Sequence, residues 1–167
     1  MSDVGKFQYI GNDPERWRKK AEALTYNAEV LTQHRLDYRQ ERDRYQEEHE
    51  LSGVDMMFAS LVLWGCAMEC FFKCLFLKRG GRLAKDGRYV GRKKHSLIEM
   101  AKDAAFPLSE SQQTILTNLS VVLQWSGRYP IATDPEQTFQ SHYWHQPDHD
   151  EVLRELVESL RREIVDN

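Results

Sequence analysis

The sequence of 167 residues predicts an all-α fold, a single domain built as a bundle of four to five helices. Apolar residues recur at steps of three and four through most of the chain, which is the period of an amphipathic helix. Capping residues, and Gly or Pro residues that stop helices, separate these stretches. No segment shows the two-residue alternation of a half-buried strand, so an all-α class is favoured over a mixed one.

The first expected helix has Asp13 as its N-cap and Pro14 at its first helical position. Its predicted core face consists of Trp17, Ala21, Leu24, Ala28 and Leu31. Residues 35–50 then interleave charges of both signs, which is typical of a solvated helical extension. The chain therefore divides into a first helix with a charged extension at 14–50 and a core at 54–165.

A second helix is expected from a capping box at Ser52 and Asp55 to about Leu77. It is apolar on nearly every side, as the central helix of a bundle would be, and we expect a second subunit to cover part of it. Its longest uncharged apolar run, 56–68, is shorter than the roughly 20 residues that span a bilayer. The N-terminus also has no apolar signal-peptide segment. We expect a soluble, cytoplasmic protein that does not enter a membrane.

Two further helices each open with a predicted capping box, at Ser96 and Glu99 and at Ser109 and Gln112. The first of them is short and ends near Phe106. The apolar faces that follow are Ile115, Leu116, Leu119, Val122 and Leu123 in the fourth helix, and Leu153, Leu156, Leu160 and Ile164 in a last helix from about Asp148. These faces complete the predicted bundle.

The most distinctive stretch is a glycine-rich basic loop at residues 78–95, whose eight Lys and Arg residues face a single acid, Asp86. Its net charge is +7, in a chain whose net charge is −3. Such a local excess indicates a site for phosphate or another polyanion, and a solvated surface loop is the alternative. The residues expected to bind the anion or nucleotide are Arg82, Arg88, Arg92, Lys93, Lys94, His95, Arg128 and Lys73.

Glu69 and Lys73 lie one turn apart on the otherwise apolar second helix. Buried charges must pair or reach the surface, so an ion pair within the helix is the favoured interpretation. The alternative places both residues at a cleft beside the basic loop, where Lys73 adds positive charge for a phosphate.

Three motifs follow one another along the chain: A-x-E-x-x-x-K, with Ala67, Glu69 and Lys73; HSL at 95–97; and RYP at 128–130. Together they resemble the HEPN domains of prokaryotes, small helical bundles found beside nucleotidyltransferases and in toxin–antitoxin and defence systems. The resemblance implies a module that binds nucleotide or RNA and forms a homodimer. It also implies a nucleotidyltransferase or antitoxin as partner. The sequence indicates no cofactor.

Ribonuclease members of that family use an Arg followed four to six residues later by His, and they need no metal. Arg128 lacks such a histidine, since the next one is His142. Arg88 and His95 have about the right spacing but precede the third helix. They are the catalytic residues of an alternative function, a metal-independent endoribonuclease, in which Arg88 neutralises the scissile phosphate and His95 transfers a proton. A third alternative is a protein–protein module that binds its partner through residues 35–50.

Two clusters contain metal-ligand residue types: Cys66, Cys70 and Cys74 in the second helix, and His142, His145 and His149 near the start of the last. The cysteines are four residues apart, whereas zinc sites favour C-x2-C turns, and free cysteine is commonly buried. Pro147 interrupts the helical spacing of the histidines. We therefore expect core packing for the cysteines and no metal site.

Overall fold

The computed structural model describes residues 2–42, 53–126 and 147–166, and it is mainly helical, which confirms the predicted all-α class. The helices are α1 (Asp3–Gly11), α2 (Pro14–Arg42), α3 (Gly53–Lys78), α4 (Leu97–Asp103), α5 (Glu110–Val121), the π-helix η1 (Val122–Ser126) and α7 (Pro147–Asp166). Two short strands, β1 (Ala84–Lys85) and β2 (Arg88–Tyr89), form a hairpin between α3 and α4.

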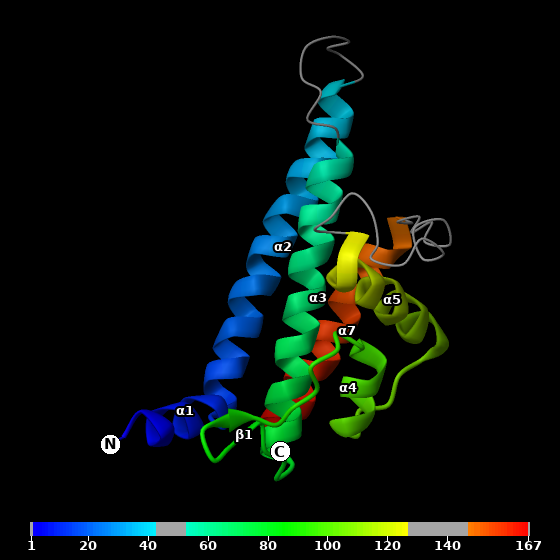
Figure 1. Ribbon diagram of the computed structural model, residues 1–167. Helices are drawn as coiled ribbons and strands as arrows, with labels where there is room; N and C mark the ends of the chain where they lie inside the picture. Colours follow the sequence, from blue (N-terminus) through cyan, green and yellow to red (C-terminus); the bar gives the residue numbers. More distant parts are fainter. Residues whose placement is uncertain (1, 43–52, 127–146, 167) are drawn as a thin grey trace.

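Helix α3 is the centre of the bundle (Figure 1). It runs beside α2 along most of its length, and α4, α5, η1 and α7 pack on its other side. Its buried side chains include Leu61, Trp64, Ala67, Met68, Phe71, Phe72 and Leu75. The cover that α3 needs is thus largely supplied by the same chain. Dimerisation remains a prediction, and it now rests on the family resemblance.

Small side chains on α2 form its contact with α3. The fully or almost fully buried residues of α2 are Ala21, Thr25, Ala28 and Thr32. Three members of the predicted core face, Trp17, Leu24 and Leu31, are only half-buried. Thr32 Oγ1 lies 3.4 Å from Nε1 of the buried Trp64, so a hydroxyl satisfies the indole donor. The helical period predicted for the buried face of α2 is correct, but the centre of that face lies on the small residues rather than on Trp17, Leu24 and Leu31.

Gly65 marks a close approach between α3 and η1. A Cβ atom at this position would lie only 2.8 Å from Cγ of Leu123. Leu123 is itself buried in the core. A glycine in the middle of a helix destabilises it, and here the lack of a side chain makes room for Leu123.

Predicted helix starts are confirmed at Pro14, where the N–H of Glu15 donates to Asp13, and at Ser109, which forms a capping box with Gln112. The start of α4 differs, because Ser96 makes no side-chain cap. The N–H of Leu97 instead donates to Oγ of Ser120 on α5, 3.0 Å away. A residue from another helix can cap as well as a local one, and sequence spacing cannot detect it.

One predicted boundary and two missing elements need correction. Helix α4 ends at Asp103, three residues before the expected end, and the sequence pattern did not predict α1. The β-hairpin was also missed, because strands of two residues are too short to show alternation. Its turn places Asp86 and Gly87 at positive φ angles of 49° and 70°, which suits a two-residue hairpin loop. The expected capping residue Ser52 lies outside the described residues, as do the side chains of 35–50.

The apolar character of α3 does not by itself separate a core helix from a membrane span. By length and composition alone Met57–Lys78 could cross a bilayer, so the short uncharged run at 56–68 does not by itself exclude a membrane span. However, 67% of the apolar window is buried inside the bundle. This burial is what a core helix of a soluble protein shows.

Candidate anion-binding site

The basic loop is anchored to the bundle by one amide side chain. Oδ1 of Asn12, which follows α1, accepts hydrogen bonds from the N–H groups of Leu83 (2.8 Å) and Ala84 (2.9 Å). Its Nδ2 donates to the carbonyl of Ala84 at 2.8 Å. Asn12 therefore fixes the first strand of the hairpin across 72 residues of sequence. Sequence patterns gave no reason to select this residue.

Two of the eight basic residues have structural roles at the end of α3. Lys78 Nζ donates to the carbonyl of Ile164 in α7 at 2.5 Å. The guanidinium of Arg79 donates to the carbonyls that end α4, including that of Ala105 at 2.9 Å, and pairs with Glu163 of α7 at 2.5 Å. These cations hold three helices together and are committed to the fold.

Arg92 is paired as well. Its guanidinium makes a two-pronged ion pair with Asp103 at the end of α4, and it lies 3.5 Å from Glu99. Both side chains of the Arg92–Asp103 pair are about 40% exposed. The hydrogen bond from Arg92 holds the pKa of Asp103 below its ordinary value, so this carboxylate is charged at neutral pH.

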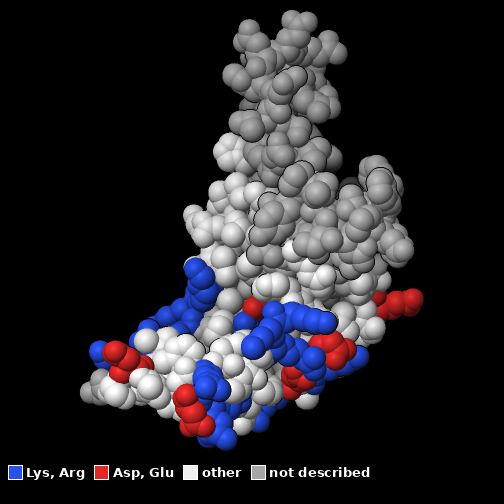
Figure 2. Space-filling view, viewed as in Figure 1, with Lys and Arg blue, Asp and Glu red and all other residues white. Residues whose placement is uncertain are grey.

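The other five basic residues of the loop are exposed and, within the part of the chain that the structure describes, have no hydrogen-bond or ion-pair partner. They are Arg82, Lys85, Arg88, Lys93 and Lys94. Figure 2 shows Lys and Arg side chains gathered over the end of the bundle that carries α1, the hairpin and α4, with a few acids among them. Five of the eight cations can therefore bind a ligand without first displacing a partner among the described residues.

Glu69 joins two of the sequence motifs. Its Oε1 is 2.5 Å from Nζ of Lys73, and its Oε2 is 2.8 Å from Nδ1 of His95. The ammonium of Lys73 also lies over two aromatic rings, 4.7 Å from the centre of Trp17 and 5.3 Å from that of Tyr89. The expected Glu69–Lys73 ion pair is present, and it lies beside the basic loop. The favoured interpretation, an ion pair within the helix, is confirmed, and a phosphate-binding role for Lys73 stays a prediction.

These contacts determine the ionisation states of Glu69 and Lys73. Burial of Glu69 acts to raise its pKa, but hydrogen bonds from Lys73 and His95 outweigh it and leave the pKa below its ordinary value. Burial acts to lower the pKa of Lys73, and the Glu69 carboxylate outweighs it, so that pKa is raised. Both residues are ionised at neutral pH.

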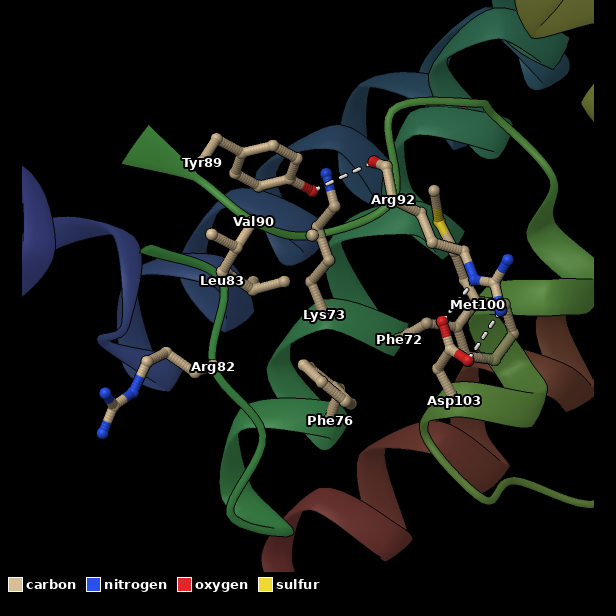
Figure 3. A pocket seen from close by; sticks show the side chains of 11 residues that line it. Phe72, Lys73, Phe76, Arg82, Leu83, Tyr89, Val90, Arg92, Met100 and Asp103 are labelled. Carbon is tan, nitrogen blue, oxygen red and sulfur yellow. Dashed lines mark hydrogen bonds and ion pairs between the residues drawn. The ribbon is translucent and has the colours of Figure 1, made fainter. Parts of the chain in front are cut away.

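A cavity of about 360 Å³ opens between the C-terminal half of α3, the loop after the hairpin and α4 (Figure 3). Its wall is apolar and consists of Phe72, Phe76, Leu83, Val90 and Met100. Lys73 and Tyr89 lie on one side of it, and the Arg92–Asp103 pair lies on the other. Arg82 borders the cavity, but its side chain points away from it in Figure 3.

Gly91 shapes this loop through its lack of a side chain. A Cβ atom there would lie 2.5 Å from Oη of Tyr89 and 2.7 Å from Cδ2 of Leu83. The Tyr89 hydroxyl donates to the carbonyl of Arg92 at 3.2 Å, which closes the turn around Gly91. The glycine thus allows the backbone to pass close to the cavity wall.

The predicted site residues separate into groups. Lys73 and Arg92 border the cavity, His95 binds Glu69, and Lys93 and Lys94 lie in the exposed segment between Arg92 and His95. Arg88, on β2, shares no hydrogen bond or ion pair with His95, both being described residues. Arg128 lies outside the described residues. The catalytic role of Arg88 and His95 therefore stays a prediction, with no direct bond between the two side chains.

The cysteines pack in the core, as predicted. Cys70 and Cys74 are buried, and burial raises the pKa of their thiols to about 12 and about 11. Such thiols are protonated at neutral pH. His142 and His145 lie outside the described residues. Across 2–42, 53–126 and 147–166, no three His, Cys, Asp or Glu residues are placed to hold a metal ion.

The first two motifs of the HEPN resemblance, at Glu69 with Lys73 and at His95, thus meet at one point of the structure. The third, RYP, lies outside the described residues. Comparison of the chain with protein-family models, curated proteins and solved structures finds no match. The resemblance therefore rests on the motifs and on the helical fold.

Proposed function

We propose that this protein is a cytoplasmic, HEPN-like module that binds a nucleotide or RNA through the basic loop. The observation that supports the proposal most strongly is the set of five exposed cations without partners among the described residues, Arg82, Lys85, Arg88, Lys93 and Lys94. They fall within a segment of 13 residues on a chain of net charge −3. A polyanion whose phosphates neutralise several of them would gain both direct ion pairs and released counterions.

The anchoring of the loop also supports binding. Asn12 holds its first part, and the Glu69–His95 contact holds its last part. The cations from Lys85 to Lys94 therefore lie on a segment that is hydrogen-bonded to the bundle near both of its ends. A preordered site loses less conformational entropy when a ligand binds, so affinity is greater for the same contacts.

The resemblance places this binding in a toxin–antitoxin or defence-type system, with a homodimer and a nucleotidyltransferase or antitoxin as partner. These parts of the proposal depend on the motifs and not on the cavity or the cations. A mass measurement by sedimentation at tens of micromolar tests the dimer, and a strictly monomeric mass would contradict it.

The test of binding is a titration with single-stranded RNA at several salt concentrations. The variant replaces Arg82, Arg88, Lys93 and Lys94 by Ala. Arg92 is kept, because its removal would free Asp103. We expect the log–log salt slope of the variant to be smaller by about 0.7 for each phosphate that the protein no longer neutralises. Equal slopes and affinities would show that the loop is a solvated connector.

A metal-independent endoribonuclease is the second candidate, and one contact favours it. Glu69 binds Nδ1 of His95, which is how a carboxylate orients a histidine that acts as a general base. The position of Arg88 and His95 before α4, rather than after the next long helix where the resembled ribonucleases carry their Arg and His, argues against it. We therefore expect RNA to remain intact over hours in EDTA. If it is cleaved and His95→Ala abolishes cleavage, the enzyme interpretation is correct.

A further inference from the structure

The cavity beside Lys73 and Arg92 has a different chemical character from the exposed, charged surface of the basic loop. Its wall is apolar, whereas its polar lining includes the ammonium of Lys73, the hydroxyl of Tyr89 and the Arg92–Asp103 ion pair. Its volume, about 360 Å³, lies at the small end of the roughly 300–1,000 Å³ of small-molecule sites. A ligand that fits has a flat apolar part and an anionic group joined to it.

A nucleotide meets this description better than a fatty acid or an aromatic acid does. Those ligands carry a single carboxylate, which one cation of the lining would satisfy. Here further exposed cations adjoin the lining residues in the sequence, Lys93 and Lys94 directly after Arg92 and Arg88 directly before Tyr89. Such an extended surface matches a chain of phosphates that begins at the cavity.

The Arg92–Asp103 pair indicates where the first phosphate would bind. Asp103 already places two carboxylate oxygens on the guanidinium, in the geometry that a phosphate also adopts. Since the pair is about 40% exposed, it contributes little net stability and can exchange its partner. A phosphate has higher charge and three acceptor oxygens, so it competes well against one carboxylate.

We propose that the cavity receives the base of a nucleotide, whose phosphate displaces Asp103 from Arg92. This inference rests on the proposed function and specifies the ligand of the same site. The ring of Tyr89 and the apolar wall enclose the base, and the hydroxyl of Tyr89 and the ammonium of Lys73 are the polar groups within reach of its edge. The nucleotide can be free or the end of an RNA strand, because both present a base beside a phosphate.

The probes are adenosine 5′-monophosphate, adenosine and inorganic phosphate, measured by calorimetry. We expect the monophosphate to bind more tightly than either of its parts. Asp103→Asn removes the competing charge and should tighten the monophosphate up to about fivefold, the equivalent of roughly 1 kcal/mol for an exposed ion pair. Weaker binding by Asp103→Asn would overturn the proposal, since it would make Asp103 a ligand group rather than a competitor.

A second variant fills the cavity without touching its charges. Val90 borders the cavity and is 52% exposed, so Val90→Trp should be tolerated by the fold and should weaken the monophosphate at least fivefold. Val30→Trp on α2, at a site 43% exposed, is the matched control and should change nothing. Unaltered binding by Val90→Trp would contradict the proposal.

Single-stranded RNA separates this inference from the proposed function. Suppose that RNA binds wild type and Val90→Trp equally, and that the monophosphate binds neither the wild type nor any variant. The cavity inference then fails while the proposed function stands. If an oligonucleotide with an abasic 5′ end binds more weakly than the complete one, the source is an RNA end. If the monophosphate binds and RNA does not, the cavity inference holds and the ligand is a free nucleotide. If neither binds, both fail.

Discussion

Oε2 of Glu69 lies 2.8 Å from Nδ1 of His95, across 26 residues of sequence. The same carboxylate binds Lys73 through its other oxygen, so one acid links the central helix to the end of the basic loop. A carboxylate that is only 14% exposed needs such partners. This gives Glu69, Lys73 and His95 a structural role, whether or not the site is catalytic.

The first prediction concerns this carboxylate. Glu69→Gln removes the charge that pairs with Lys73 and orients His95, so we expect the free energy of unfolding to fall by about 1.5–3 kcal/mol, the usual contribution of a hydrogen bond to a charged group. Urea denaturation followed by circular dichroism measures it. The control is Glu155→Gln, which changes an exposed carboxylate on α7 and should have little effect.

The same variant gives a pH prediction. Folding lowers the pKa of Glu69 below its ordinary value of 4.5, so its contribution to stability is present above pH 4.5. That contribution is lost as the pH falls through the pKa of the folded state. The stability difference between wild type and Glu69→Gln should therefore be constant near neutrality and shrink in acid. A difference that grows in acid would contradict the assignment.

Arg79 and Arg88 belong to one basic loop but should behave in opposite ways. Arg79→Ala removes bonds to the end of α4 and to Glu163, and we expect a loss of about 1.5–3 kcal/mol in stability with little change in RNA affinity. Arg88→Ala should change stability by no more than about 0.5 kcal/mol and weaken RNA binding. Thermal melts and RNA titrations of both proteins make the comparison. Similar effects of the two variants would refute the division into structural and binding cations.

Gly65 offers a test of the core. In an open helix, Gly→Ala adds up to about 1 kcal/mol of stability. Here the new methyl would meet Leu123, so we expect Gly65→Ala to destabilise by about 1–3 kcal/mol. Leu123→Ala should remove that penalty, and the coupling from a double-mutant cycle reports it. Additive effects would show that the two residues do not touch one another.

Much of the fold could be predicted because it follows local rules. The period of apolar residues located α3, α5 and α7, and the predicted starts at Pro14 of α2 and at the N-cap Ser109 of α5 are confirmed. What was missed depends on distant partners. Ser120 caps α4 from another helix, and Asn12 holds the hairpin from the turn between α1 and α2. Such hydrogen bonds produce no repeating pattern in the sequence.

The anion-binding site itself stays a prediction, and only some of its geometry could be expected from the sequence. The concentration of charge in the loop pointed to an anion, and the positions of Lys73 and Arg92 agree with a site there. The sequence could not separate Arg79 and Arg92, which have acidic partners, from Arg88, which has none among the described residues. Nor could it reveal the cavity, because its wall comes from α3, the loop and α4 together.

The most direct test of the account compares two variants of equal charge. One replaces Arg82, Arg88, Lys93 and Lys94 by Ala, and the other replaces four exposed cations of α2 and α7, Lys19, Lys20, Arg154 and Arg162. Single-stranded RNA is titrated against both and against wild type between about 50 and 200 mM salt. We predict that wild type and the α2/α7 variant lose affinity roughly 10- to 50-fold across this range, while the loop variant binds weakly throughout with a flat slope. If the two variants lose affinity equally, net charge alone governs binding, and the loop is not the site.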